Sequence, residues 1–407
     1  MNNTNLSRRR FLKGLAAAGV AVPAMNLLSN VAFAASGQAS HTVVNVYLRG
    51  AMDSLSAIIP YNEAVYFDTR PNVAIPAEGR IDLDGQFALH QAMSPLHQFY
   101  QQGELAFVVA TGLGVLSSTR SHFDAQRRME AGTDNHSQPD GWLGRYLSAT
   151  PGSSTVFRGV GMGRVQKSLQ GYGQALGISH LEDFRLNTPA AFSNTAAAGA
   201  LEQLYQGVEH SLLAGQATQT LSALDVAASR ALGAVPKPAA YGTGKVGTAL
   251  HQVAELINAD LGLEAASVDM GGWDLHSTMG TWDAGDMRDQ LSELSQSLAA
   301  FYQEIAAYRS NITIVVMSEF GRRVKQNDSG GTDHGTGGAM MVMGQGINGG
   351  RIFGNWPGLD VLDRGDLQIT TDYRQVLSEL MDRRLGQGHL LSQIFPDYTA
   401  ANYLGIS

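Results

Sequence analysis

Short β-branched and aliphatic runs alternate along this chain with longer segments of helical periodicity. The runs expected to be strands cover residues 42–48, 105–110, 265–270, 312–317 and 339–342. Helices are expected to start at residue 121 and to cover residues 246–261, 287–308 and 371–385. Strands that alternate with helices predict a mostly parallel sheet with helices on both faces. The sequence therefore predicts an α/β fold around one central sheet.

One segment departs from this alternation. Residues 188–232 are rich in Ala, Gln and Leu with helical spacing, which is typical of a helical insertion, and we expect the insertion to span about residues 188–261. No internal repeat or low-complexity linker divides the remainder. We therefore expect a single domain over residues 35–407.

Carboxylates and imidazoles gather beside three of the expected strands. One cluster follows residues 265–270, a second follows 312–317, and a third precedes 339–342. Hard cations favour carboxylate oxygen, and zinc-like ions also favour imidazole nitrogen. The candidate metal ligands in these clusters are Asp274, His276, Glu319, Asp333 and His334.

Ligands of open α/β sheets collect where the strands end. Asp53 follows the first expected strand, and Ser121 lies beyond the second, at the start of a helix. We therefore expect Asp53 and Ser121 to meet the clusters of Asp274 and Glu319 in one cleft, with His334 as a further member.

Each of these residues also has an ordinary structural interpretation. Asp53 could serve an Asx-type turn, and Asp274 with His276 could form a polar loop. Ser121 could be a simple N-cap, with Asp124 at the capping-box offset, or it could sit where helix amides hold an anion.

Four further side chains have open roles. His122 could be a ligand, a general acid or an ordinary helix residue. Arg49, Arg120 and Arg322 could clamp a phosphate or sulfate, or could be surface arginines.

The N-terminus carries an export signal. Arg8, Arg9 and Arg10 precede Phe-Leu-Lys, a mildly apolar segment runs from residue 14 to 33, and Ala-Phe-Ala precedes Ala35. This pattern predicts a twin-arginine (Tat) signal peptide over residues 1–34 rather than a membrane anchor. A Sec signal with extra charge is the alternative. We expect a periplasmic or secreted protein that meets the Tat translocase during export.

Composition excludes several classes of function. The 407-residue chain has no cysteine, which excludes thiolate zinc sites, disulfides and thiol catalysis. Its formal charge is −8, and removal of Arg8, Arg9, Arg10 and Lys13 with the signal leaves about −12. This acidity argues against nucleic acid as a partner. No later segment is long and apolar enough to be a stable membrane anchor.

The motifs together resemble those of the bacterial domain-of-unknown-function family 1501. The matching pieces include Leu-Arg-Gly-Ala-Met-Asp ending at Asp53, Arg-Ser-His-Phe from Arg120, and Gly-Gly-Trp-Asp-Leu-His ending at His276. Ser-Glu-Phe-Gly-Arg ending at Arg322 and Gly-Thr-Asp-His-Gly around His334 complete them. The resemblance covers nearly all of the mature chain.

This family looks related to the alkaline phosphatase and sulfatase superfamily. The resemblance implies a three-layer α/β/α sandwich and two metals that hydrolyse phosphate or sulfate esters. It implies Asp53 as a ligand, Ser121 as the nucleophile, and Asp274, His276 and His334 around one metal.

The chain departs from the superfamily pattern near Glu319. Glu319 stands where the superfamily usually has Asp-His, and Phe320 replaces that His, so the second metal is in question. Ala51 and Ser54 stand where the family more often has glycine.

The resulting hypothesis is an exported metal-dependent hydrolase of phosphate or sulfate esters. It would hold one or two divalent ions, zinc or manganese, and act on a small-molecule or polysaccharide-linked anionic ester. The alternative is a catalytically degenerate relative that binds an anionic envelope component or a protein partner. Tat export alone suggests a third possibility, a secreted redox factor.

Overall fold

A computed structural model describes residues 41–114, 118–152, 155–186, 188, 193–206, 211–400 and 402–407. The expected signal peptide, residues 1–34, lies outside the described residues. Within them, no helix has both the length and the apolar character needed to cross a membrane.

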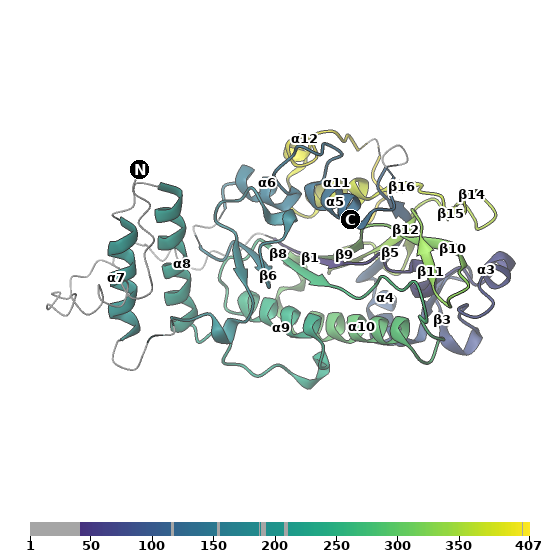
Figure 1. The fold of residues 1–407 in the computed structure, drawn as a ribbon, viewed down its shortest axis with the longest axis horizontal. Coiled ribbons are helices and arrows are strands. Elements are labelled where there is room, and N and C mark those ends of the chain that lie inside the picture. Colours follow the sequence, from purple (N-terminus) through teal and green to yellow (C-terminus); the bar gives the residue numbers. More distant parts are fainter. Residues whose placement is uncertain are drawn as a thin grey trace.

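A nine-stranded sheet forms the centre of the molecule (Figure 1). Its strands lie in the order β13 (Ile352–Phe353), β5 (Leu105–Gly112), β12 (Gly338–Met343), β9 (Ile312–Ser318), β1 (Thr42–Leu48), β8 (Ala265–Met270), β6 (Gly159–Met162) and β7 (Leu176–Ile178), and β16 (Thr371–Asp372) pairs with β5. The five strands expected from the sequence are all present within one or two residues of their expected ends.

The sheet is parallel except at one strand. β1 runs parallel to β8 and β9, while β12 is antiparallel to both β9 and β5. β5 therefore points the same way as β9 and β1. The carboxyl ends of β1, β5, β8 and β9 lie at one edge of the sheet, and β12 begins at that same edge.

Helices cover both faces of the sheet, as Figure 1 shows. The face with the long amphipathic helix carries α4 (Ser94–Gln101), α9 (Lys245–Asn258) and α10 (Asp286–Glu304). The other face carries α5 (His122–Ala131), α6 (Trp142–Ala149), α11 (Tyr373–Arg383) and α12 (Leu391–Ile394). The protein is thus a three-layer α/β/α sandwich, as predicted.

α10 shows why these residues form a covering helix. Its apolar side chains recur every three or four positions and form one wholly buried stripe: Leu291, Leu294, Leu298 and Phe301. The stripe packs into the larger core cluster together with residues of α9 and β8.

The expected helical insertion contains two different kinds of helix. α7 (Asn194–Gln206) and α8 (Ser211–Ser229) stand beside the sandwich at one end of the molecule, whereas α9 lies along the sheet (Figure 1). α9 packs against both α10 and β8 and has a largely buried surface. It belongs structurally to the covering layer.

Two small sheets border the carboxyl edge. One has the order β11 (Thr332–His334), β10 (Arg322–Gln326), β15 (Asp366–Leu367) and β14 (Leu362–Asp363). The other has the order β2 (Ile58–Ile59), β4 (Ala88–His90) and β3 (Arg80–Asp82), with α2 (Ser54–Ala57) and α3 (Ala64–Thr69) nearby in sequence.

Candidate metal centre

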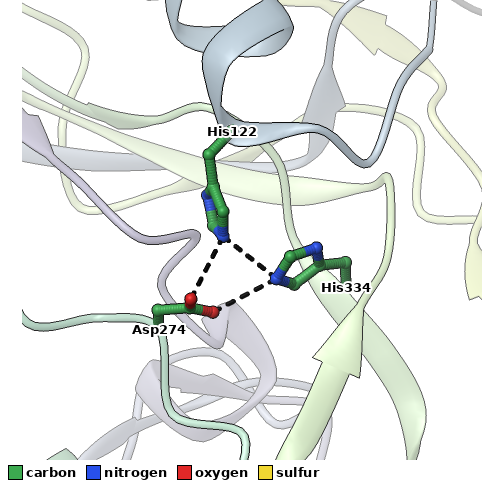
Figure 2. Close-up of side chains that lie close together, drawn as sticks. All are labelled: His122, Asp274 and His334. Atoms are coloured by element: carbon green, nitrogen blue, oxygen red, sulfur yellow. Dashed lines mark hydrogen bonds and ion pairs between the residues drawn. The ribbon is translucent and has the colours of Figure 1, made fainter.

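Two imidazoles and a carboxylate converge at the carboxyl edge of the sheet. His122 begins α5, Asp274 lies in the loop after β8, and His334 ends β11 just before β12. One ligand atom from each lies within 4.8 Å of the others, and Figure 2 shows the side chains pointing toward a common centre. Segments far apart in sequence therefore supply one potential metal site.

His276 joins this group from the same loop as Asp274. Its Nε2 lies 2.8 Å from Nε2 of His334 and 3.0 Å from a carboxylate oxygen of Asp274. Nε2 of His122 lies 3.0 Å from Nε2 of His334. Three imidazole Nε2 atoms thus lie within 3.4 Å of the Asp274 carboxylate, but only those of His122 and His334 belong with it to the group of described residues whose ligand atoms all lie within 4.8 Å of one another.

The opposite nitrogen of each ring faces an oxygen acceptor. Nδ1 of His122 lies 2.8 Å from Glu319, and Nδ1 of His334 lies 2.8 Å from the carbonyl of Arg120. Nδ1 of His276 lies 3.3 Å from Asp333. These acceptors favour the tautomers with the ring proton on Nδ1, in which the Nε2 lone pairs are directed inward, as in metal-ligating histidines. Lone pairs that face one another repel unless a cation lies between them.

Glu319 is an orienting residue in this geometry. It is wholly buried, and its Oε1 accepts hydrogen bonds from Nδ1 of His122, from the backbone N–H of Gly50 and from Nε2 of Gln126, each at 2.8 Å. It does not belong to the group whose ligand atoms converge. Glu319 was expected to be a metal residue. It instead contacts His122, one of the converging residues, from the side away from their centre.

Gly50 is needed where these loops approach closely. Its φ is +117°, and a Cβ at this position would lie 2.6 Å from the backbone nitrogen of Asp274. Ala51, which stands where the family more often has glycine, also has a left-handed φ of 60°. The β1 and β8 loops can thus lie together only with a small residue between them.

Asp333 likewise supports a ligand. Its Oδ1 accepts hydrogen bonds from Asn327 and from Nδ1 of His276. The hydrogen bonds from Asn327 and from Nδ1 of His276 hold the pKa of this carboxyl below its usual range despite partial burial.

Arg322 holds the loops of the site together. Its guanidinium donates to the backbone carbonyls of Gly50, Ala51, Trp273 and Thr332, and at 2.6 Å to Asp274. It is 2% exposed, so its donors are directed into the protein. Arg322, expected as a catalytic or anion-clamping residue, is here bonded to the ligand-bearing loops.

The charge states of the centre suit a cation. Burial alone would raise the pKa of Asp274, but the hydrogen bond and the charge of Arg322 act against it, and the pKa is lowered to about 2. Burial lowers the pKa of His334, against the opposing effects of Asp274 and the Arg120 carbonyl. At neutral pH the centre therefore presents an anionic carboxylate and a neutral imidazole, the forms that ligate metals.

Ser121 is the N-cap residue of α5, as expected. Its side chain is exposed and makes no capping hydrogen bond. Asp124, expected at the capping-box position, instead forms an ion pair with Arg128. The hydroxyl therefore lies next to His122 without a capping role.

Asp53 lies apart from the converging ligands. Its Oδ2 is 2.7 Å from Nη1 of Arg70, and its Oδ1 accepts from the backbone N–H of Leu55 as the N-cap of α2. Both Asp53 and Arg70 are buried. The structure brings Asp274 and His334 together with His122, places His276 beside His334, and pairs Asp53 with Arg70.

The role of His122 stays open from the sequence alone. Its position at the first turn of a helix beyond a strand end is the one signal that the sequence offers for it, and the neighbouring Ser121 shares that signal. Gln126, one turn further along α5, also contributes through its bond to Glu319. No local pattern marks either residue, because their partners come from distant loops.

The family is now identifiable. A family model described as "Protein of unknown function (DUF1501)" matches residues 40–366. The chain belongs to this family. The resemblance that the motifs predicted is thus confirmed, and the comparison with curated proteins finds no match.

Solved structures similar to this chain include two hydrolytic enzymes and a periplasmic domain. Phosphonoacetate hydrolase from Sinorhizobium meliloti 1021 is 13% identical with a TM-score of 0.30, and the match covers 70% of this chain and 57% of that one. The C-terminal periplasmic domain of EcEptC from Escherichia coli is 10% identical with a TM-score of 0.39, covering 91% and 90%. Alkaline phosphatase from the Antarctic bacterium TAB5 is 10% identical with a TM-score of 0.32, covering 88% and 99%.

Proposed function

We propose that this DUF1501 protein is a metal-dependent hydrolase of phosphate or sulfate esters. One observation carries the proposal: the Nε2 atoms of His122, His276 and His334 converge on Asp274 while each Nδ1 is held by an oxygen acceptor. Nitrogen lone pairs and a carboxylate face one another at its centre, and a positive charge there would stabilise them. A divalent cation would satisfy His122, Asp274 and His334 at once, with His276 beside them.

The donor set favours zinc or manganese over calcium. Imidazole nitrogen suits zinc, and a mixture of carboxylate and imidazole suits manganese, whereas calcium takes oxygen ligands. When bound, the ion would polarise an ester oxygen and favour an ionised oxygen nucleophile.

Ser121 is the proposed nucleophile. Its exposed hydroxyl is adjacent to His122 at the N-terminus of α5, and it makes no capping hydrogen bond. The free amides and dipole of the helix end favour a bound anion at the same place. The substrate would be an anionic ester of a small molecule or polysaccharide.

Metal analysis and an ester panel test this proposal. We expect purified protein to contain a divalent ion and, when loaded with zinc or manganese, to hydrolyse at least one aryl phosphate or sulfate ester. Ser121→Ala should abolish most turnover and change the free energy of unfolding by less than about 0.5 kcal/mol, because no cap hydrogen bond is lost. Ser137→Ala, at another exposed serine, is the matched control and should retain full activity.

A second candidate function is anion or partner binding without turnover. It is favoured by Phe320, whose ring centroid lies 4.9 Å from that of His122 and 5.1 Å from that of His334. An apolar ring there occupies the side of the centre where the superfamily resemblance leads us to expect a histidine. Metal-loaded wild-type protein that hydrolyses no ester of the panel would favour this role.

We further propose that the protein is exported by the Tat pathway. The proposal rests on Arg8 and Arg9 followed by Phe-Leu-Lys and an Ala-Phe-Ala cleavage site before Ala35. Replacing Arg8 and Arg9 together by lysine should leave precursor in the cytoplasm. Normal export of that variant would contradict the proposal.

A further inference from the structure

One face of α5 carries three polar side chains that are spaced by one helical turn. His122, Gln126 and Glu130 follow one another at intervals of four residues, so they lie on the same face of the helix. This face meets the ends of β9 and β1, where Glu319 and Arg49 directly follow the strands. Gln126, in the middle of the three, contacts both of these residues.

The contacts of the Gln126 amide fix which of its ends faces which partner. Its Nε2 lies 2.8 Å from Oε1 of Glu319, and its Oε1 lies 3.0 Å from Nη1 of Arg49. The same oxygen of Glu319 accepts from the backbone N–H of Gly50 at 2.8 Å, and a backbone N–H can only donate. A guanidinium likewise has donors and no acceptor. The amide therefore presents its nitrogen to Glu319 and its oxygen to Arg49, because the reverse orientation would lose both bonds.

Arg49, considered from the sequence as a clamp for phosphate or sulfate, is held within the protein. Its guanidinium pairs with Glu130 at 3.0 Å and with Asp269 of β8 at 2.7 Å. These two partners stay in place if the Gln126 amide is removed. Removal of the amide should therefore break the connection between Arg49 and Glu319 without unfolding the helix.

We propose that Gln126 is a positioning residue of the candidate metal centre. Its amide holds Oε1 of Glu319 in place, and this oxygen lies 2.8 Å from Nδ1 of His122. A ring that is fixed at Nδ1 has its Nε2 directed toward the centre, where it lies 3.0 Å from Nε2 of His334. Gln126 would thus act on a bound ion through Glu319 and His122, and not by contact. The inference rests on the proposed function, because a bound ion is what requires this orientation of His122.

Gln126→Met tests the proposal, because methionine has a similar length and no amide. Zinc affinity should fall by about three- to tenfold, which is less than the 10–100-fold loss typical of a residue that contacts a ligand directly. Competition with a chromophoric chelator measures the affinity. Gln375→Met is the matched control, since this half-buried glutamine of α11 donates to the carbonyl of Asn402 at 2.7 Å. The control variant should bind zinc as wild type does.

A double-mutant cycle tests whether Gln126 acts through Glu319. In protein that already carries Glu319→Ala, the oxygen that Gln126 holds is absent. Gln126→Met should then change zinc affinity by less than about twofold, because residues that act through one another are not additive. The same loss of zinc affinity in both backgrounds would show an effect that bypasses Glu319, and would overturn the proposal.

Nuclear magnetic resonance of the zinc-loaded protein gives a measurement specific to His122. Exchange of its Nδ1 proton with water is slowed by the hydrogen bond to a buried carboxylate, and it should become at least about fivefold faster in Gln126→Met. His334 is the internal comparison, because its Nδ1 is held by the backbone carbonyl of Arg120, whose side chain pairs with Asp366 at 2.6 Å. Its exchange rate should not change. Equal acceleration at both rings would indicate a general loosening of the fold and would overturn the positioning role.

The outcomes separate this proposal from the proposed function. Wild-type protein that binds no zinc would overturn the metal centre, and the positioning role with it. Zinc binding by wild type that Gln126→Met leaves unchanged would overturn the positioning role alone. Neither result requires turnover of an ester.

Discussion

Two polar clusters at the same edge of the sheet show why similar residues have different roles. In one, Asp53 is buried against Arg70 and also accepts from the Leu55 amide, so charge and hydrogen bonds are balanced within the protein. In the other, Asp274 meets three Nε2 atoms and only Arg322 supplies a full positive charge. A strand-end carboxylate is a candidate ligand where imidazole nitrogens gather around it, as at Asp274, and a structural residue where hydrogen-bond donors alone surround it, as at Asp53.

Removal of the Asp53 carboxylate should have the largest effect on stability. Asp53→Ala leaves the buried Arg70 guanidinium without its counter-charge, which typically costs about 3–5 kcal/mol. Chemical denaturation measures this loss. Zinc affinity of the folded variant should stay within about twofold of wild type, and a clear loss of zinc binding would return Asp53 to the ligand set.

Removal of a converging ligand should weaken zinc binding and keep the fold, the reverse of the result expected for Asp53→Ala. His334→Ala should weaken zinc binding by more than about 100-fold, beyond the 10–100-fold loss typical of an outer-shell partner. The fold should be kept, because the ring lies at the edge of the sheet and is partly exposed. Competition with a chromophoric chelator measures the affinity. His136→Ala, at an exposed histidine paired with arginines, is the control and should bind zinc normally.

A change to a residue that contacts a ligand, and not the ion itself, should weaken zinc binding by an intermediate amount. Glu319→Gln keeps the shape of the side chain but replaces the charged acceptor of His122 Nδ1, and should weaken zinc binding by about 10–100-fold. If Glu319→Gln weakened binding as much as His334→Ala, Glu319 would be a direct ligand. No effect would contradict its orienting role.

His90 differs from the histidines of the candidate centre, because its Nδ1 accepts a hydrogen bond where theirs face oxygen acceptors. This difference predicts a pH effect on stability. Its Nδ1 accepts from the Ala92 amide at 3.0 Å, and burial, joined by the charge of Arg288, lowers its pKa to about 4. The unfolded histidine binds a proton below about pH 6.5, whereas the folded one does not until about pH 4. The free energy of unfolding should therefore fall as pH drops through this window, by about 1.4 kcal/mol per pH unit for this proton.

His90→Asn should reduce that slope, because asparagine can keep the acceptor and does not titrate. Urea unfolding at several pH values between about 4 and 6.5 measures the difference. His180→Asn, at an exposed histidine, should retain the wild-type profile. An identical slope in His90→Asn and wild type would show that His90 does not contribute.

Much of the fold could be predicted because its signals are local. The β-branched run of β1 and the apolar stripe of α10 each require burial on a known period, so both appear at their expected residues. α9 was assigned with the neighbouring helices because composition alone does not show what a helix packs against. Contacts with β8 and α10 decide that it covers the sheet.

The candidate site was predicted in part for the same reason. Asp274 and His276 lie two residues apart, so one loop presents both. The roles of Asp53 and His122 depend on partners distant in sequence: Arg70 for Asp53, and Glu319 with His334 for His122. Spacing within a motif carries no information about such partners.

The sequence by itself determined the strands, the covering helices, the family and the residue types suited to a metal. The tertiary structure decided which of those residues meet. His334 precedes a strand, so the rule that ligands follow parallel strands could not place it. Because β12 runs antiparallel to β9 and β5, its start lies at the edge where its neighbours end, and His334 joins Asp274 and His122 there. Strand direction is fixed by pairing with distant segments, and local sequence preference does not encode it.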